Sequence, residues 1–225
     1  MPISPLVRFG TSTWTYVGWQ GQVYTRQYAK SRFAQECLGE YCQYQHNDEP
    51  LFRTVGNDAT FYRPPTTNQL RRYLNQIPDG FEMCFKVWEE ITIPSYAKKP
   101  RYGPRAGQPN PRFLDSKLFN ELVLTPYREA KFEPHTGPFL FEFQRHGMST
   151  DEFCSRLDKF FYSFPVIFGM RWRFATLVSS VLAISKCCLS TGWHMSTIIG
   201  PTCRPSSNNT HRCEGSPRCS RCCDS

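Results

Sequence analysis

The sequence predicts an α/β protein in which parallel strands alternate with helices. Within residues 7–165, short runs of alternating apolar residues are each followed by a segment whose apolar residues lie three and four positions apart. This alternation is typical of a doubly wound sheet or of a (β/α)8 barrel. No strand is followed by GxGxxG or by GxxxxGKS/T, and this weakens the case for a nucleotide-binding function.

The first unit combines a short strand with a helix. Val7–Thr13 is a run of apolar and small residues, which predicts a strand. Three aromatic residues follow it, Trp14, Tyr16 and Trp19, and their rings could form the wall of a binding site or cap the core. Apolar residues at helical spacing then predict the first helix over residues 26–42.

Two further strands enclose the second helix. The second strand is predicted over residues 52–62. Thr66 or Thr67 can cap the helix that follows, and the turn Pro78–Gly80 ends it. Residues 81–87 alternate apolar and polar side chains, which predicts the third strand.

Residues 93–111 predict a long loop, because they are rich in proline, glycine and basic residues. Loops of this length are usually functional or mobile. The basic side chains of this loop could surround a phosphate or an acid, or they could simply be solvated.

The fourth unit follows this loop. Asp115 or Ser116 is expected to cap a helix that is interrupted near Pro126. Residues 137–143 predict the fourth strand, and Ser149–Glu152 has the form of a capping box in front of another helix.

The chain changes character after residue 165. Residues 1–165 hold 20 Lys and Arg against 17 Asp and Glu, a net charge of +3, whereas residues 166–225 hold 7 against 2, a net charge of +5. Seven of the 11 cysteines also lie in the second part. Cys219 and Cys222 form a CxxC pair there, but without a second well-spaced pair it does not predict a structural zinc site. We therefore divide the chain into four β/α units at 1–165 and an irregular tail of low order at 166–225.

The sequence favours a cytoplasmic protein with no membrane contact. Residues 1–9 contain two prolines and no apolar core of a signal peptide. The most apolar run, residues 174–184, is far shorter than the ~20 residues that cross a bilayer. Scattered cysteines before the tail fit a reduced compartment.

A barrel would gather its functional side chains where the parallel strands end. Acids and a lysine at these ends are the groups that general acid–base chemistry uses, and nearby aromatic rings could stack on a ligand. The candidate catalytic residues are Lys86, Glu89, Glu90 and Glu142, and the candidate binding residues are Ser12, Trp14, Trp19, Asp58, Thr60, Tyr62 and Gln144.

Two roles are open for the lysine. Lys86 could stabilise an oxyanion or anchor an anion while Glu89 or Glu90 moves a proton. Alternatively, Lys86 could pair with Glu142 or with a neighbouring acid. Residues 1–165 contain three histidines and no cluster of histidines and acids, so no metal site is expected. The sequence identifies no cofactor.

Four segments resemble the YecE-like family, known as domain of unknown function 72: RFGTSTWTYVGWQG, FRTVGNDATFYRPPT, GFEMCFKVWEEIT and TGPFLFEFQRHGM. The resemblance covers residues 7–165 in the family's order. It implies a TIM-type barrel, sometimes described as related to sugar isomerases, with no established substrate. Many members carry Glu and Asn in a second-strand pattern VExNxTFY. Gly56 and Asp58 stand at these places here, so an acid role of that strand does not carry over directly.

The family would continue with a fifth strand, but this chain departs from it between Phe164 and Phe168. When the codons are read one nucleotide earlier, with permitted synonymous choices, residues 168–176 become FRYAVEIRN. In the same frame, residues 191–203 become HGVAHVYNHWTHM and residues 204–210 become PSLVEQH. These strings look like the family's next segments in the correct order. We interpret the tail as the product of a one-base frameshift that removes the fifth strand.

The leading functional hypothesis is a barrel enzyme that acts on a small polar, sugar-like or phosphorylated molecule and is inactive in this truncated form. A full barrel takes ~250 residues and eight units, and a half-barrel leaves strand edges unpaired. The alternative is a basic nucleic-acid-binding protein or a non-catalytic binding protein. The net charge of only +3 in residues 1–165 argues against nucleic acid.

Sequencing the genomic locus tests the frameshift. We expect codons in the earlier frame to encode the three family-like strings, because codon degeneracy alone does not readily produce three ordered matches. An open reading frame in which these codons are missing would contradict the frameshift and favour a divergent C-terminal region.

Overall fold

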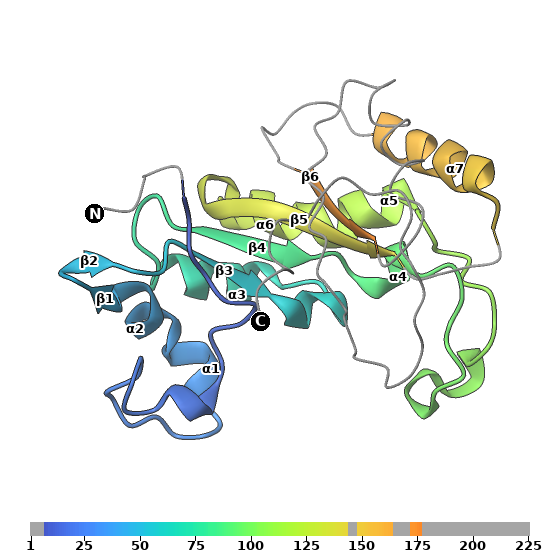
Figure 1. Cartoon of the computed structure of the whole chain (residues 1–225). Coiled ribbons are helices and arrows are strands. Elements are labelled where there is room, and N and C mark those ends of the chain that lie inside the picture. The colour runs from blue at the N-terminus through green and yellow to red at the C-terminus, as the bar shows by residue number, and fades with distance from the viewer. Residues whose placement is uncertain (1–6, 144–147, 164–171, 177–225) are drawn as a thin grey trace, which may run out of the picture.

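The computed structural model describes residues 7–143 and 148–163 and the backbone of residues 172–176. Its centre is a parallel sheet of four strands: β3 (Thr54–Asn57), β4 (Glu82–Lys86), β5 (Thr136–Phe143) and β6 (Trp172–Thr176). The spatial order of the strands is their order along the chain (Figure 1). All four point toward the side where α4 (Glu89–Thr92) lies.

The predicted first strand lies along β3. Phe9 forms a parallel bridge with Phe52, and the Gly56 amide donates to the Thr11 carbonyl at 2.8 Å. The backbones approach closely here: a Cβ atom on Gly56 would lie 2.9 Å from the carbonyl oxygen of Ser12. Glycine at position 56 therefore permits the pairing of the N-terminal segment with the sheet.

The remaining elements connect or cover these strands. The helices are α1 (Phe33–Glu36), α2 (Leu38–Gln43), α3 (Thr67–Leu74), α5 (Ser116–Leu118), α6 (Thr125–Ala130) and α7 (Thr150–Tyr162), with a π-helical segment η4 (Phe119–Leu124) between α5 and α6. Short 3-10 helices are η1 (Val17–Trp19), η2 (Asp58–Phe61), η3 (Pro100–Arg105) and η5 (Glu133–His135), and β1 (Gln45–His46) pairs with β2 (Glu49–Pro50).

The predicted caps are confirmed. Thr66 caps α3 in a capping box with Gln69, and Asp115 accepts a hydrogen bond from the Leu118 amide at the start of α5. Ser149 accepts from the Glu152 amide at the start of α7. A hydroxyl or carboxylate oxygen satisfies a helix amide that has no partner within the helix, which explains why these residues begin the helices.

The first helix is shorter than predicted because a carboxylate holds the chain before it. Glu40 Oε1 accepts hydrogen bonds from the Thr25 amide at 2.6 Å and from the Arg26 amide at 3.2 Å. Tyr28 donates its hydroxyl to Glu40 Oε2 at 2.8 Å. These bonds from a distant side chain keep residues 26–32 outside the helix, which begins only at Phe33.

The second strand is also shorter than predicted. It ends at Asn57, and the chain turns into η2. The Thr60 hydroxyl lies 2.7 Å from the carbonyl oxygens of both Asn57 and Lys86, so it ties this turn to the end of the neighbouring strand.

The two faces of the sheet differ. One face is packed with aromatic side chains: Phe85 contacts Tyr127 of α6 with ring centroids 5.0 Å apart, and Phe141 contacts Phe160 of α7 at 5.9 Å. Since strand side chains alternate between faces, Cys84, Lys86 and Glu142 belong to the opposite, less buried face. That face carries the polar groups at the strand ends.

The expectation that a fifth strand is lost is wrong. Trp172–Thr176 pairs in parallel with β5, from Phe139 opposite Trp172 to Phe143 opposite Thr176. Strand pairing uses backbone groups that every residue except proline offers, so a strand can form here without the family's own sequence. Within the described residues the sheet is open and does not close into a barrel. The division at residue 165 and the frameshift stay predictions, and the tail's CxxC pair lies outside the described residues.

The Glu40 carboxylate should stabilise the fold in a pH-dependent way. Partial burial raises the pKa of Glu40, but the hydrogen bonds from Thr25, Tyr28 and Arg26 lower it by more, so the pKa lies below its usual value. This stabilisation is present above pH 4.5, the usual pKa of the carboxyl, and is lost as the pH falls through the lowered pKa. We expect Glu40→Gln to lower the free energy of unfolding by about 1–2 kcal/mol at neutral pH, measured by chemical denaturation.

Glu121→Gln is the matched control, because Glu121 is exposed and its ion pair with Lys117 spans 4.0 Å. If both variants lose the same stability, or if the Glu40→Gln loss persists at pH values below the lowered pKa, the carboxylate does not hold this segment.

Candidate functional site

A lysine between two carboxylates lies at the ends of neighbouring strands. Lys86 Nζ at the end of β4 is 3.1 Å from Glu142 Oε2 of β5 and 3.4 Å from Asp58 Oδ1 at the start of η2. The lysine side chain is 30% exposed. Parallel strands bring their carboxyl ends to one edge of the sheet, which is why three residues far apart in sequence meet here. We call Asp58, Lys86 and Glu142 the strand-end cluster.

The charges of the strand-end cluster keep its lysine protonated. Partial burial lowers the pKa of Lys86, but the hydrogen bond and charge of Glu142, together with the charge of Asp58, raise it by more. The net effect is a pKa above the usual lysine value. Of the two roles open for Lys86, the structure shows the pairing with Glu142. Because its pKa is raised, the Lys86 ammonium is a hydrogen-bond donor at neutral pH and not a base.

Glu89 lies in a different cluster, on α4. It is 8% exposed, and its Oε2 accepts a hydrogen bond from Arg101 at 2.6 Å and from the Tyr102 hydroxyl at 2.8 Å. Arg101 also lies over the ring of Tyr62, with 5.2 Å from its Cζ to the ring centroid. Tyr62 is itself 62% exposed.

Glu90 anchors the same long loop at a second point. Its carboxylate accepts from Arg105 and from the Tyr96 hydroxyl, each at 2.6 Å, and the Asn110 amide donates to its backbone carbonyl at 2.8 Å. Basic residues of the predicted loop thus bind internal acids. Within the described part of the chain, no ion pair joins Glu89 or Glu90 to Lys86. Their catalytic role stays a prediction.

The structure gives the other candidate residues different surroundings. Thr60 is buried and bonded to backbone carbonyls, and Trp19 packs against the core with its ring stacked on Tyr41 at 6.4 Å. Ser12 is exposed beside Gly56. Gln144 lies outside the described residues.

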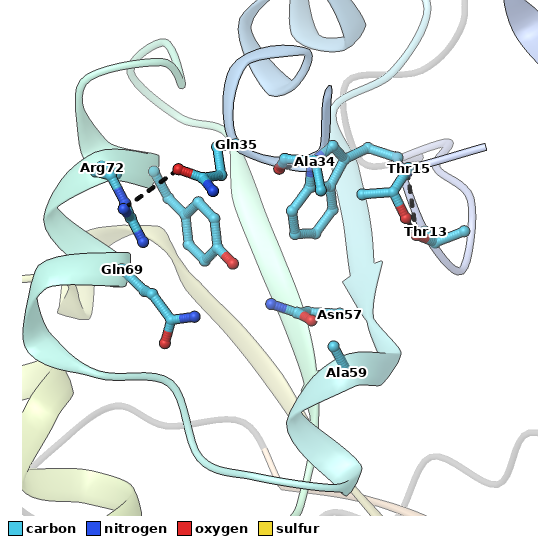
Figure 2. Close-up of a pocket in the computed structure, with 10 residues that line it drawn as sticks. Thr13, Thr15, Ala34, Gln35, Asn57, Ala59, Gln69 and Arg72 are labelled. Carbon is cyan, nitrogen blue, oxygen red and sulfur yellow. Dashed lines mark hydrogen bonds between the residues drawn. The ribbon is translucent and has the colours of Figure 1, made fainter. Parts of the chain in front are cut away.

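Trp14 lines a pocket of about 290 Å³ that sequence reasoning missed (Figure 2). The N-terminal loop, α1, the end of β3 with η2, and α3 enclose it. Its lining residues are Thr13, Trp14, Thr15, Ala34, Gln35, Asn57, Ala59, Gln69, Arg72 and Tyr73. The sequence offered one indication of this pocket. One face of the predicted helix carries Gln69, Arg72 and Tyr73, because these residues lie three and four positions apart.

Neither a metal cluster nor a membrane helix was found in the part of the chain that the structure describes. No three His, Cys, Asp or Glu side chains are grouped so that they could hold a metal ion there. None of the described helices combines the length and apolar character needed to span a bilayer.

The fold and the strand-end cluster define an α/β protein with a parallel sheet and polar groups at the carboxyl ends of its strands. The profile of the family described as "Protein of unknown function DUF72" matches residues 8–175. The chain belongs to this family. The match reaches into β6, beyond the predicted boundary at residue 165.

Solved structures of the family resemble this fold. A DUF72 family protein from Enterococcus faecalis superposes with a TM-score of 0.53 at 15% sequence identity, over 84% of this chain and 59% of that chain. A DUF72 family protein from Thermotoga maritima gives a TM-score of 0.48 at 18% identity, over 83% of this chain and 62% of that one. The chain thus spans less than two thirds of the length of either protein. No curated protein matches it.

The long loop of residues 93–111 should open when its anchor, Glu90, is removed. Glu90→Gln removes the charge that holds Arg105, so we expect trypsin to cleave after Arg105 several-fold faster, as followed by mass spectrometry over time. Glu49→Gln serves as the control, since Glu49 is exposed and lies 3.9 Å from its partner Arg53. Equal cleavage rates in the two variants would show that the ion pair does not hold the loop.

Proposed function

We propose that the strand-end cluster binds a small, uncharged, polyhydroxylated molecule at the mouth of the first half of a TIM-type barrel. Three features support the barrel: the strands are parallel, they follow one another in chain order, and the chain belongs to the DUF72 family. In such barrels, ligands bind at the carboxyl ends of the strands. Asp58, Lys86 and Glu142 lie at these ends.

The observation that carries this proposal is the position of Lys86 between two carboxylates. One ammonium and two carboxylates sum to a charge of −1, which repels a phosphate group. Sugar hydroxyls, in contrast, can donate to the carboxylates and accept from the ammonium, and such charge-assisted hydrogen bonds are the strong ones. Of the sugar-like and phosphorylated ligands that the sequence leaves open, the cluster favours the sugar-like one.

The same groups suggest the chemistry of an enzyme. A carboxylate that accepts a hydrogen bond from a substrate hydroxyl can also accept its proton, and a neighbouring ammonium stabilises the negative charge that develops on oxygen. In this proposal Glu142 or Asp58 moves the proton and Lys86 stabilises the oxyanion. The inactivity of this chain stays a prediction from the sequence.

Nucleic-acid binding receives less support. Two arginines of the long loop, Arg101 and Arg105, are paired with Glu89 and Glu90 at 2.6 Å. A phosphate backbone would have to compete with these internal acids for the same guanidinium groups.

Ligand binding to the strand-end cluster can be measured by saturation-transfer NMR. We expect D-xylose and myo-inositol to bind the full chain, and D-xylose 5-phosphate to bind more weakly. Lys86→Met should weaken sugar binding by roughly tenfold, the loss expected for a charge-assisted hydrogen bond. Lys117→Met is the control, because the Lys117 side chain is 84% exposed on α5.

Two results would contradict the proposed function. One is tighter binding of the sugar phosphate than of the sugar, which would indicate an anion site. The other is sugar binding that Lys86→Met leaves unchanged.

A further inference from the structure

The pocket in Figure 2 is separate from the strand-end cluster. Asn57 lines the pocket, whereas the carboxylate of the next residue, Asp58, contacts Lys86. Asn57, the last residue of β3, and Asp58, the first residue of η2, therefore belong to two different sites. The proposed function gives this pocket no role.

The pocket carries a single positive charge. Arg72 is the one ionised side chain at neutral pH among the ten lining residues. Its guanidinium donates to the Gln35 amide oxygen at 3.4 Å. No carboxylate of the described residues lies within ion-pair distance of Arg72. Arginine presents its donors as a planar fork that matches a carboxylate, so a charged ligand group for this pocket is an anion.

Amide and hydroxyl groups beside Arg72 can donate further hydrogen bonds. The Gln69 amide oxygen accepts from the Thr66 amide at 2.8 Å, which leaves the nitrogen end of Gln69 for the pocket. Figure 2 shows this side chain reaching into the pocket opposite Asn57. Burial raises the pKa of Tyr73 by more than the hydrogen bond of Asn57 and the charge of Arg72 lower it, so its hydroxyl stays neutral.

Two aromatic rings form the apolar wall. Trp14 and Tyr73 meet edge to face, with centroids 5.4 Å apart and planes at 82°. The Trp14 indole nitrogen donates to the Ala34 carbonyl at 3.3 Å, which fixes its orientation. Rings held in this way offer a rigid surface for a planar group. A volume of about 290 Å³ lies at the small end of ligand pockets, so the ligand is small.

We propose that this pocket binds a small planar carboxylate. Arg72 and Gln69 hold the carboxylate oxygens, and the Trp14–Tyr73 wall contacts the planar part of the ligand. This site differs from the strand-end cluster in place, charge and ligand class, and it does not depend on the proposed function.

Three probes separate the contributions to binding. Benzoate carries both a carboxylate and a ring, acetate carries only the carboxylate, and benzamide is the uncharged counterpart of benzoate. We expect benzoate to bind the full chain more tightly than either of the others in NMR titrations, with shifts at Trp14 and Gln69. Because an ionic contact is screened by salt, the affinity should fall as the ionic strength rises.

Three variants on the same helix test the role of the arginine. Arg72→Gln should weaken benzoate binding by roughly tenfold, as expected for the loss of a charge-assisted hydrogen bond. Arg71→Gln removes the same charge one residue away, where the side chain contacts the Glu129 carbonyl at 3.2 Å, and should leave binding unchanged. Arg72→Lys keeps the charge but loses the planar fork of donors, so it should bind benzoate more tightly than Arg72→Gln does. Such partial binding would also show that a substitution at this position leaves the helix folded.

Several outcomes would overturn the proposal. These are equal binding of benzoate and benzamide, equal losses in Arg71→Gln and Arg72→Gln, and the absence of benzoate shifts at Trp14. Lys86→Met should leave benzoate binding intact. A failure of the sugar-binding proposal for the strand-end cluster can therefore be distinguished from a failure of the carboxylate-binding proposal for this pocket.

Discussion

The parallel pairing of β3, β4 and β5 is the constraint on which the candidate sites depend. Pairing in register places Asn57 next to Phe85 and Lys86 next to Leu140, so the ends of three strands meet at one edge. The hydroxyl of Thr60 reinforces this edge, because it reaches the carbonyls of both Asn57 and Lys86 at 2.7 Å. The strand-end cluster and one wall of the pocket both follow from that geometry.

Charge pairing separates groups that maintain the structure from groups that are suited to bind a ligand. Glu89 and Glu90 are nearly buried, and each is matched by a guanidinium and a tyrosine hydroxyl of the long loop. Such pairs are costly to break, because removal of one partner leaves a buried charge. The strand-end cluster differs, since its two carboxylates outnumber its single ammonium and its side chains are part-exposed. Arg72 differs again, because its neighbours in the pocket are amides, hydroxyls and rings.

Membership of the DUF72 family accounts for the order of the elements up to β6, yet this chain covers only part of its relatives' length. The sheet is nevertheless well packed on one face, where phenylalanines of β5 contact those of η4 and α7 and also Phe85 of β4. Burial of aromatic rings supplies a large part of the stability of a core. The other face keeps its polar side chains in partial contact with solvent, and the strand-end cluster lies on it.

The sequence by itself determined the features that depend on neighbouring residues. The caps at Thr66 and Ser149 and the strands at 82–86 and 136–143 follow from local hydrogen bonding and side-chain alternation. The pairing of Lys86 with Glu142 was one of two open alternatives. Only the tertiary structure decided which acids meet which bases, that Glu40 delays the start of the first helix to Phe33, and that Arg72 and Trp14 line one pocket. Each of these contacts joins residues that are far apart in sequence, and a local sequence pattern does not determine which distant residues meet in the folded chain.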